Sequence, residues 1–344
     1  MNSFKELDLT DSLVELVRRT ATDLPADMED ALAKARESDA AGSAAEGQDT
    51  AVVTFTLTLL HNNDGESQVV NAGSGLEDFG GAARFKTVVD NLRGAVTPSA
   101  SEDVMMVSSG DNFLAGPEFN AGLTNGVPFY DTIAMELIGY DAVALGNHDF
   151  DFGPDVLADF LDGYTTAPPY ASANLDFSGE ARLQAYVTSG VIAPSHIITL
   201  AGGDIVVAGG GDELLANPGD LLIPGDETEV VGAYPQVVND NSGDPVPIVT
   251  TSGEYRYVGK LVVGFDATGL VETIYTANSG PVRVATGTCN GSTPCTDAVV
   301  PDPTVQAQVV DPVEAALAVM DSNIVGQSQV DLDGLRSSVR SMET

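Results

Sequence analysis

The sequence predicts a layered α/β fold. From Val52 onward, short β-branched and apolar runs alternate with longer helical runs, which is the pattern of strands and helices stacked in layers. The 344 residues are enough to bury a large core, in one large domain with appendages or in two domains, and we favour two. Polar motifs follow three of the strand-like runs, and ligands bind at this edge of an open α/β sheet.

The first 48 residues predict a helical appendage. Asp11 can cap a helix that contains Leu13 and Val17, and Pro25 suits the first turn of a second helix. The segment AAGSAAEGQD that follows is a linker of small residues.

Buried strands and intervening helices are predicted next. The strands are Val52–Leu60, Val104–Val107 and Ala142–Leu145, which are rich in β-branched and apolar residues. The helical runs between them are Gly81–Leu92 and Pro128–Ile138.

The second half of the chain predicts a hairpin, a strand and a helix. Ser195–Leu200 and Ile205–Ala208 flank a glycine-rich turn over residues 201–204, as in a β-hairpin. Alternating apolar residues predict a strand at Tyr255–Phe265, and Pro301–Ile324 predicts a long helix.

Net charge is the outlier of the composition. The chain has 14 basic and 51 acidic residues, a formal charge of −37. Nucleic acids and anionic membranes are repelled by such a field, so we expect neither as a partner. Charge of this size destabilises a compact state at low salt, whereas molar salt shortens the Debye length to roughly 3 Å. The composition therefore favours a halophilic protein, and a generally soluble acidic protein is the alternative.

Apolar runs and cysteines bear on the compartment. No run of about 18 apolar residues exists, so no membrane insertion is expected, and the first residues lack the pattern of a secretory signal. Cys289 and Cys295 flank a short polar loop that could close a disulfide, but two cysteines do not decide the matter.

Residues Gly146–Gly153 spell GNHDFDFG directly after a predicted strand. This loop places an amide, an imidazole and two carboxylates at a strand end, a composition typical of a binding site. His148 is one of three histidines in the chain.

The GNHDFDFG loop resembles the Asn-His-Asp/Glu block of calcineurin-like metallophosphoesterases, in particular the amino-terminal domain of the bifunctional 5'-nucleotidase family. Leu59–Glu66, Ser109–Pro117 and Ser172–Asp176 resemble three further motifs of that family in the same order. The resemblance implies a layered αββα metallophosphoesterase sandwich with the helical segment as an amino-terminal appendage. It divides the chain into residues 1–48, a phosphoesterase-like domain over 49–282 with an internal deletion near 200–205, and a tail over 283–344 leading toward a missing carboxy-terminal domain.

The resemblance also implies site residues. The implied metal ligands are Asp64, Glu66, Asp111, Asn147 and Glu213. Asp111 would bridge two ions, and His148 would face the substrate, where it stabilises the phosphoryl group or protonates the leaving oxygen. Asp151 would orient the imidazole and raise its basicity. His61 and His196 match no ligand position, so we expect structural roles for both.

The chain departs from the family at its histidines. Glu66 stands where the family has the histidine of Asp-x-His, and Gly209–Glu213 is the best match to Gly-Gly-His-x-His, although a plain glycine turn is an equal alternative. A third histidine has no counterpart, because the segment after Asn174 is too short to hold it. The remaining ligands offer oxygen, which favours Mg²⁺, Mn²⁺ or Ca²⁺ over Zn²⁺.

These features imply a metal-dependent phosphomonoester hydrolase of the 5'-nucleotidase type, with two-metal water attack at an altered and weakened site. The substrate would be a small phosphoester, in this family a nucleotide. The alternative is a non-catalytic binding or structural module derived from a phosphoesterase. Localisation stays open, because the family is usually secreted or periplasmic and this chain shows no signal peptide.

A second, short resemblance concerns the amino-terminal segment. Residues 12–37 resemble the start of class I fumarate hydratases. The lyase chemistry of that class needs an iron-sulfur cluster held by several cysteines, and the chain has two. We therefore expect no lyase function, and the segment suggests a chimeric or rearranged gene.

Overall fold

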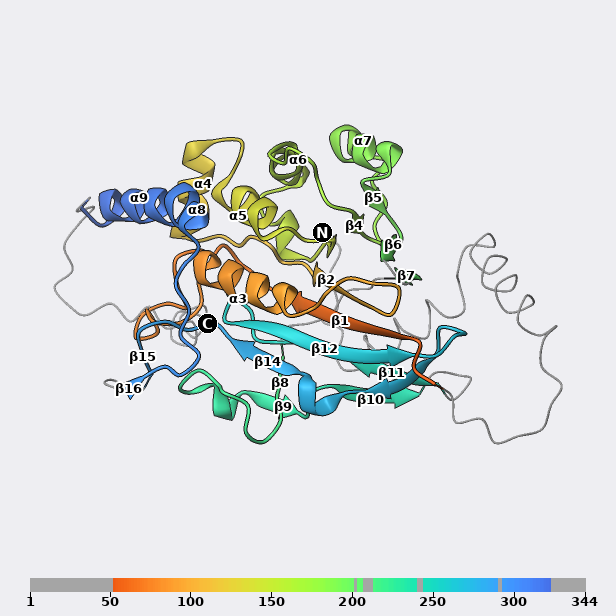
Figure 1. The fold of residues 1–344 in the computed structure, drawn as a ribbon. Helices are drawn as coiled ribbons and strands as arrows, with labels where there is room; N and C mark the ends of the chain where they lie inside the picture. Colours follow the sequence, from red (N-terminus) through yellow and green to blue (C-terminus); the bar gives the residue numbers. More distant parts are fainter. Residues whose placement is uncertain (1–51, 201–202, 207–212, 240–243, 290–292, 323–344) are drawn as a thin grey trace, which may run out of the picture.

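The computed structural model describes residues 52–200, 203–206, 213–239, 244–289 and 293–322. A mixed eight-stranded sheet lies at the centre, in the order β13-β12-β1-β2-β3-β4-β5, with β14 also paired to β12 (Figure 1). Its strands are β1 (Phe55–Asn62), β2 (Glu102–Ser108), β3 (Ala142–Ala144), β4 (Tyr170–Ala171), β5 (Ile192–Ala193), β12 (Tyr257–Phe265), β13 (Val271–Ile274) and β14 (Gly280–Arg283). From β1 to β5 all neighbours run parallel. The carboxyl ends of β1, β2 and β3 therefore share one edge of the sheet.

Helices cover one face of this sheet (Figure 1). They are α3 (Ala82–Gly94), α4 (Pro117–Asn125), α5 (Tyr130–Ile138), α6 (Pro154–Asp162), α7 (Ala181–Ser189), α8 (Pro303–Val305) and α9 (Asp311–Ser322). A π-helical stretch, η4 (Gln306–Val310), joins α8 to α9. Leu60 and Met106 of the sheet pack in one buried core with Phe85 and Phe160 of the helices. Burying a side chain of this size contributes about 1.5–3 kcal/mol, so this core is what holds the helical layer on the sheet.

Small strand pairs lie around the rest of the sheet, on the side away from the helices and at its ends (Figure 1). They are β6 (Ile197–Leu200) with β7 (Gly203–Val206), β8 (Leu214–Leu215) with β9 (Val230–Gly232), β10 (Gln236–Asn239) with β11 (Pro245–Ile248), and β15 (Thr288–Cys289) with β16 (Thr293–Pro294). Leu215 packs with Leu261 and Val263 of β12, and Ile198 packs near Leu57 of β1. Both faces of the central strands are thus buried, as parallel strands require.

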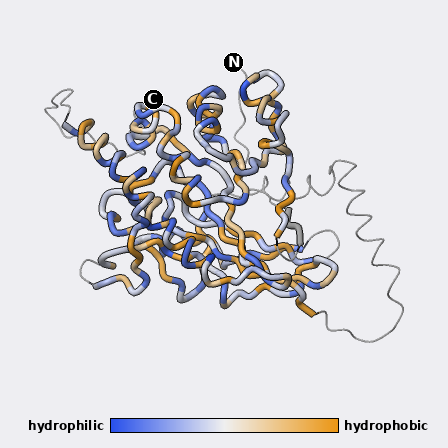
Figure 2. The backbone as a smooth tube through the Cα atoms, turned by 45° about the horizontal axis from the view of Figure 1, so that its top comes forward, coloured by the Kyte–Doolittle hydropathy of each residue, from blue (hydrophilic) through white to orange (hydrophobic). Residues whose placement is uncertain are grey.

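The predicted mixed α/β architecture is confirmed, with a central sheet and helices. The hairpin forms between β6 and β7, but its second strand starts at Gly203, so the turn is shorter than predicted. The predicted helical tail is helical from Pro303 to Ser322 and includes the π-helical stretch. Hydrophobic and hydrophilic residues alternate along the helices (Figure 2), as expected when one face packs on a core. The amino-terminal appendage lies outside the described residues, and the three domain boundaries stay predictions.

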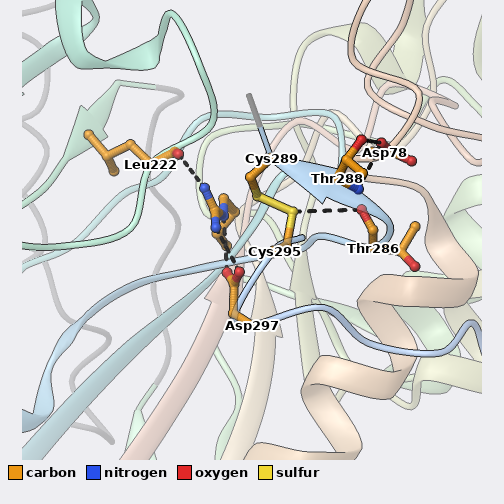
Figure 3. The surroundings of a disulfide bond; sticks show 8 residues. Asp78, Leu222, Thr286, Thr288, Cys289, Cys295 and Asp297 are labelled. Carbon is orange, nitrogen blue, oxygen red and sulfur yellow. Dashed lines mark hydrogen bonds and ion pairs between the residues drawn. A yellow bond between two sulfur atoms is a disulfide. The ribbon is translucent and has the colours of Figure 1, made fainter. Parts of the chain in front are cut away.

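The disulfide that the sequence left open forms between Cys289 and Cys295. Both cysteines are buried in a small core with Phe79 and Tyr257. Figure 3 shows an ion pair and a hydrogen bond around the bridge. The Arg283 guanidinium donates to the Asp297 carboxylate, and Thr288 donates to Asp78. The bridge therefore closes a loop that is tied to the segment preceding α3.

Within the described ranges, every helix is too short or too polar to span a lipid bilayer.

Candidate functional site

The loops after β1 and β2 run side by side. The backbone N–H of Asp64 donates to the carbonyl of Gly110 at 3.0 Å, and the N–H of Glu66 donates to the carbonyl of Asp111 at 3.1 Å. Strand pairing thus continues beyond the strand ends into the two loops. It brings the carboxylates of Asp64, Glu66 and Asp111 to one edge of the sheet.

These same three acidic residues adopt left-handed backbone conformations. Their φ angles are 47° for Asp64, 48° for Glu66 and 49° for Asp111. This conformation costs a residue with a Cβ roughly 1–2 kcal/mol, and less for aspartate, whose short polar side chain tolerates it. Backbone strain of this kind clusters at functional sites, and three of the six non-glycine residues with positive φ among the described residues are predicted ligands.

Asn63 orients the carboxylate of Asp64. Its side-chain amide donates to Oδ2 of Asp64 and to the carbonyl of Thr251, both at 2.7 Å, while its Oδ1 accepts the N–H of Thr251 at 3.2 Å. The N–H of Glu254 also donates to the Asp64 carbonyl. A Cβ on Gly253 would lie 2.6 Å from that carbonyl oxygen, so the close approach of the segment after β11 requires glycine.

The GNHD loop after β3 packs directly on Asp111. The backbone N–H of His148 donates to Oδ1 of Asp111 at 2.7 Å. A Cβ on Gly146 would overlap the same carboxylate, and a Cβ on Gly110 would lie 2.6 Å from the Gly146 nitrogen. Glycine is therefore needed at both positions for the two loops to meet. Asn147 is exposed between Gly146 and His148.

His148 and Asp151 form a pair across a 3-10 turn, His148–Phe150, that precedes α6. Nδ1 of His148 lies 2.8 Å from Oδ2 of Asp151, and both side chains are about one third exposed. Burial lowers the pKa of His148, but the hydrogen bond to Asp151 and the charges of Asp111, Asp151 and Glu66 together raise it above its ordinary value. The imidazole therefore holds a proton more readily than a free histidine does.

Asp149, which sequence reasoning left without a role, is the buried carboxylate of the loop. It is 1% exposed and accepts the backbone N–H groups of Asn112 and Gly146, both at 2.9 Å. Burial raises its pKa to about 7 against the opposing effect of these hydrogen bonds. The sequence shows Asp149 as the acidic residue of the Asn-His-Asp motif. It does not show that Asp149 is buried, because the burial depends on contact with a loop 37 residues away.

Glu213 lies in the same cleft as two of the other predicted ligands. An open cleft of about 480 Å³ is lined by Asp64, Glu66 and Glu213. Its remaining wall consists of Leu214, Gly225, Asp226, Glu229, Val231, Ser252, Gly253, Glu254 and Arg256. The structure thus brings Glu213 to the loops after β1, whereas Gly209–Asp212 lie outside the described residues.

The loops meet, but their ligand atoms are spread out. Among the described residues, the one group of three His, Cys, Asp or Glu ligand atoms within 4.8 Å of one another is Cys289, Cys295 and Asp297. Those cysteines are joined in a disulfide and are not metal ligands. The carboxylates of the four predicted acidic ligands therefore lie near one another at this edge of the sheet, but no three of their oxygen atoms come within 4.8 Å of one another. These ligands are Asp64, Glu66, Asp111 and Glu213. Their oxygen atoms are of the type that hard divalent cations prefer, so the donor set fits such an ion in chemistry.

The two other histidines have structural hydrogen bonds, as expected. Nε2 of His61 lies 2.8 Å from the hydroxyl of Tyr234, and burial lowers the pKa of His61 to about 4, so the ring is neutral. His61 packs against Gly259 of β12, where any Cβ would overlap the imidazole. Nε2 of His196 lies 2.9 Å from the carbonyl of Tyr170.

The chain is similar to known proteins in both sequence and fold. No family model matches the chain. It is 34% identical over 146 residues to the trifunctional nucleotide phosphoesterase YfkN of Bacillus subtilis, covering 39% of this chain and 9% of that protein. It is 38% identical over 135 residues to the 5'-nucleotidase of Vibrio vulnificus, covering 39% and 23%. The chain thus spans less than a quarter of the length of these curated relatives.

Solved structures show the same fold. The 5'-nucleotidase precursor of Thermus thermophilus matches with a TM-score of 0.62 and 24% identity, over 83% of this chain and 64% of that chain. The NAD nucleotidase of Haemophilus influenzae matches with a TM-score of 0.50 and 16% identity, over 84% and 59%.

These comparisons decide between the two resemblances seen in the sequence. The similarity of residues 12–37 to fumarate hydratases is not borne out by them, and that segment lies outside the described residues. The similarity carried by the four loop motifs is confirmed. Over part of its length, the chain is a homologue of the 5'-nucleotidases and nucleotide phosphoesterases, and it has the fold of a 5'-nucleotidase.

Proposed function

We propose that this chain is a metal-dependent phosphomonoester hydrolase of the 5'-nucleotidase type. The observation that carries the proposal is the position of His148, whose backbone is bound to Asp111 and whose ring is bound to Asp151. The proteins that are similar in sequence are a nucleotide phosphoesterase and a 5'-nucleotidase, which supports phosphoester hydrolysis as the reaction class. Since the chain spans only part of those relatives, the whole reaction is a proposal for this chain.

The acidic edge of the sheet would hold the cations. The residues proposed as ligands are Asp64, Glu66, Asp111, Asn147 and Glu213. Divalent ions bound there would neutralise charge on the phosphoryl oxygens and activate a water. Carboxylate and amide oxygens favour Mg²⁺, Mn²⁺ or Ca²⁺ over Zn²⁺.

His148 would carry the proton chemistry. Its raised pKa keeps the ring protonated over a wider pH range, so it can donate a proton to the leaving oxygen or stabilise the phosphoryl group. Asp151 holds Nδ1, which fixes the ring orientation and directs the other ring nitrogen to the substrate. The substrate would be a small phosphoester and, by similarity to the relatives, a nucleotide.

The experiment is hydrolysis of para-nitrophenyl phosphate with added Mn²⁺ or Mg²⁺, compared with the same protein in EDTA. We expect stimulation by the metal and its loss in His148→Ala. Hydrolysis that is unchanged in EDTA, or equal in His148→Ala and wild type, would contradict the proposal.

A non-catalytic module derived from a phosphoesterase is the second candidate. It is favoured by the spread of the carboxylates, which form no group of three within 4.8 Å among the described residues, and by the glutamates that replace two family histidines. Calorimetry for Mn²⁺ binding, together with an assay of phosphomonoester turnover, distinguishes the two candidates. Binding of Mn²⁺ without any turnover of a panel of phosphomonoesters supports the module, and binding with turnover supports the enzyme.

A further inference from the structure

Asp149 is buried between two loops that carry proposed ligands. One carboxylate oxygen accepts the backbone N–H of Asn112 and the other accepts the backbone N–H of Gly146, each at 2.9 Å. The side-chain amide of Asn112 donates to both oxygens, at 3.3 and 3.1 Å. Asn112 directly follows Asp111, and Gly146 directly precedes Asn147. Asp149 is thus bonded to the chain beside one proposed ligand on each loop.

We propose that Asp149 is a positioning residue that fixes Asp111 and Asn147 relative to each other. It would act through the backbone of the two loops and would touch neither the cations nor the substrate. The part of this inference that concerns cation affinity rests on the proposed function.

The loops beside Asp149 are packed so closely that neither can shift without moving the other. The carboxylate of Asp111 lies against Gly146 so closely that a Cβ there would overlap it, and Gly110 approaches the Gly146 nitrogen in the same way. A small shift of the GNHD loop would therefore change the position of Asp111 and of the His148 N–H bonded to it. Displacements of about 1 Å can cost 100-fold in activity.

The chemistry of the contact explains why a carboxylate stands here. Both oxygens of Asp149 accept N–H groups, so each side of the group must be an acceptor. In Asp149→Asn the shape is kept, but one oxygen becomes an NH₂ group that faces an N–H donor. A buried donor left without an acceptor is strongly unfavourable, so one of the two loops would have to move.

Asp149→Asn is the test, and Asp103→Asn is its matched control. Asp103 is also a buried aspartate, 8% exposed, but it lies at the amino-terminal end of β2, whereas the loop with Asp111 follows the carboxyl end of that strand. The first readout is hydrogen exchange of the Asn112 and Gly146 amides without any metal. We expect exchange at least tenfold faster in Asp149→Asn than in wild type, and no change at these two amides in Asp103→Asn.

The second readout is the affinity for Mn²⁺ measured by calorimetry. We expect a loss of about 10- to 100-fold in Asp149→Asn and no more than a twofold change in Asp103→Asn. Equal loss in both variants would mean a general effect on stability and would overturn the positioning role.

The two proposals fail in different ways. If wild type binds no Mn²⁺, the proposed function fails, while hydrogen exchange still decides whether Asp149 fixes the loops. Should Asp149→Asn not fold, exchange in wild type decides alone. The Asn112 and Gly146 amides must then be protected to the level of the β1 and β2 amides, and exchange as fast as at an exposed loop overturns the inference.

Discussion

Nδ1 of His148 lies 2.8 Å from Oδ2 of Asp151, one turn further along the chain. The carboxylate raises the pKa of the ring against the opposing effect of burial and holds one ring nitrogen. His148 is in turn bonded through its backbone to Asp111. The proposed acid therefore has both its orientation and its position set by carboxylates.

For this pair we expect His148→Ala to lower kcat for metal-stimulated phosphomonoester hydrolysis by about 10²–10⁴-fold, the usual contribution of a positioned acid. Asp151→Asn keeps the ring and should cost about 10–100-fold. Steady-state kinetics at saturating Mn²⁺ measures both. Asp155→Asn is the control, because its side chain is 86% exposed on α6. Full activity in both His148→Ala and Asp151→Asn would show that the pair has no catalytic role.

Glu213 and Glu229 line the same cleft, which makes them a matched pair. Only Glu213 is a proposed ligand. Glu213→Gln should weaken Mn²⁺ binding by about tenfold, which corresponds to roughly 1.4 kcal/mol. Glu229→Gln removes the same charge from the same cleft and should change the affinity by less than twofold. If calorimetry gives the same loss for both, the cleft attracts cations by its general charge and Glu213 is no ligand.

The Cys289–Cys295 disulfide should stabilise the fold even though it closes a short loop. Loop-closure entropy for so few residues predicts about 2 kcal/mol. The double variant with serine at both positions should therefore lose about that much free energy of unfolding in a urea titration. Dithiothreitol should have the same effect on wild type and none on the variant. Equal unfolding midpoints for the two proteins would contradict the prediction.

A half-buried glutamate should make stability depend on pH. Oε2 of Glu118 accepts the N–H groups of Val69 and Val70, and burial raises its pKa from 4.5 to about 7. Because the folded state holds this proton more tightly than the unfolded state, the contribution is complete below pH 4.5 and is lost as pH rises through about 7. The melting temperature of Glu118→Gln minus that of wild type should therefore increase between pH 4.5 and 8. Glu180→Gln, at an exposed glutamate, is the matched control, and an equal increase in both variants would contradict the prediction.

The acidic surface predicts stabilisation by salt. With a formal charge of −37, repulsion between carboxylates weakens the compact state at low salt, and molar KCl screens it. We expect the melting temperature to rise from 0.05 M to 2 M KCl. A protein of balanced charge and similar size serves as the control. Equal melting temperatures at both concentrations would exclude the halophilic interpretation.

The sequence predicted the elements that depend on local pattern. The three strands predicted to begin at Val52, Val104 and Ala142 are β1, β2 and β3. The ends of the observed strands differ from the predicted ends by no more than three residues. The helices predicted over Gly81–Leu92 and Pro128–Ile138 are α3 and α5. Period-two and helical patterns are properties of neighbouring residues, which is why they could be read directly.

Contacts between distant segments could not be predicted in this way. The Asn63 amide that orients Asp64 also donates a hydrogen bond to the carbonyl of Thr251, 188 residues away. No local sequence pattern predicts a contact between such distant residues. Asp149 was visible as part of a motif, but its role depends on Asn112 in another loop. The small strand pairs, such as β8 with β9, rest on burial against β12 rather than on their own sequence. The proposed site residues were likewise found by resemblance, and their roles await the experiments above.

The left-handed backbone at Asp64, Glu66 and Asp111 has a consequence for laboratory evolution. Glycine adopts this conformation without the steric cost of a Cβ, so a library of this protein selected for thermal stability alone should enrich glycine at Glu66 more than at Asp64 and Asp111, whose carboxylates accept hydrogen bonds from Asn63 and His148. The same library selected for phosphoester turnover should keep the acids. Sequencing the two pools would reveal how much folding stability the chain gives up in order to keep three oxygen-bearing side chains at the edge of its sheet.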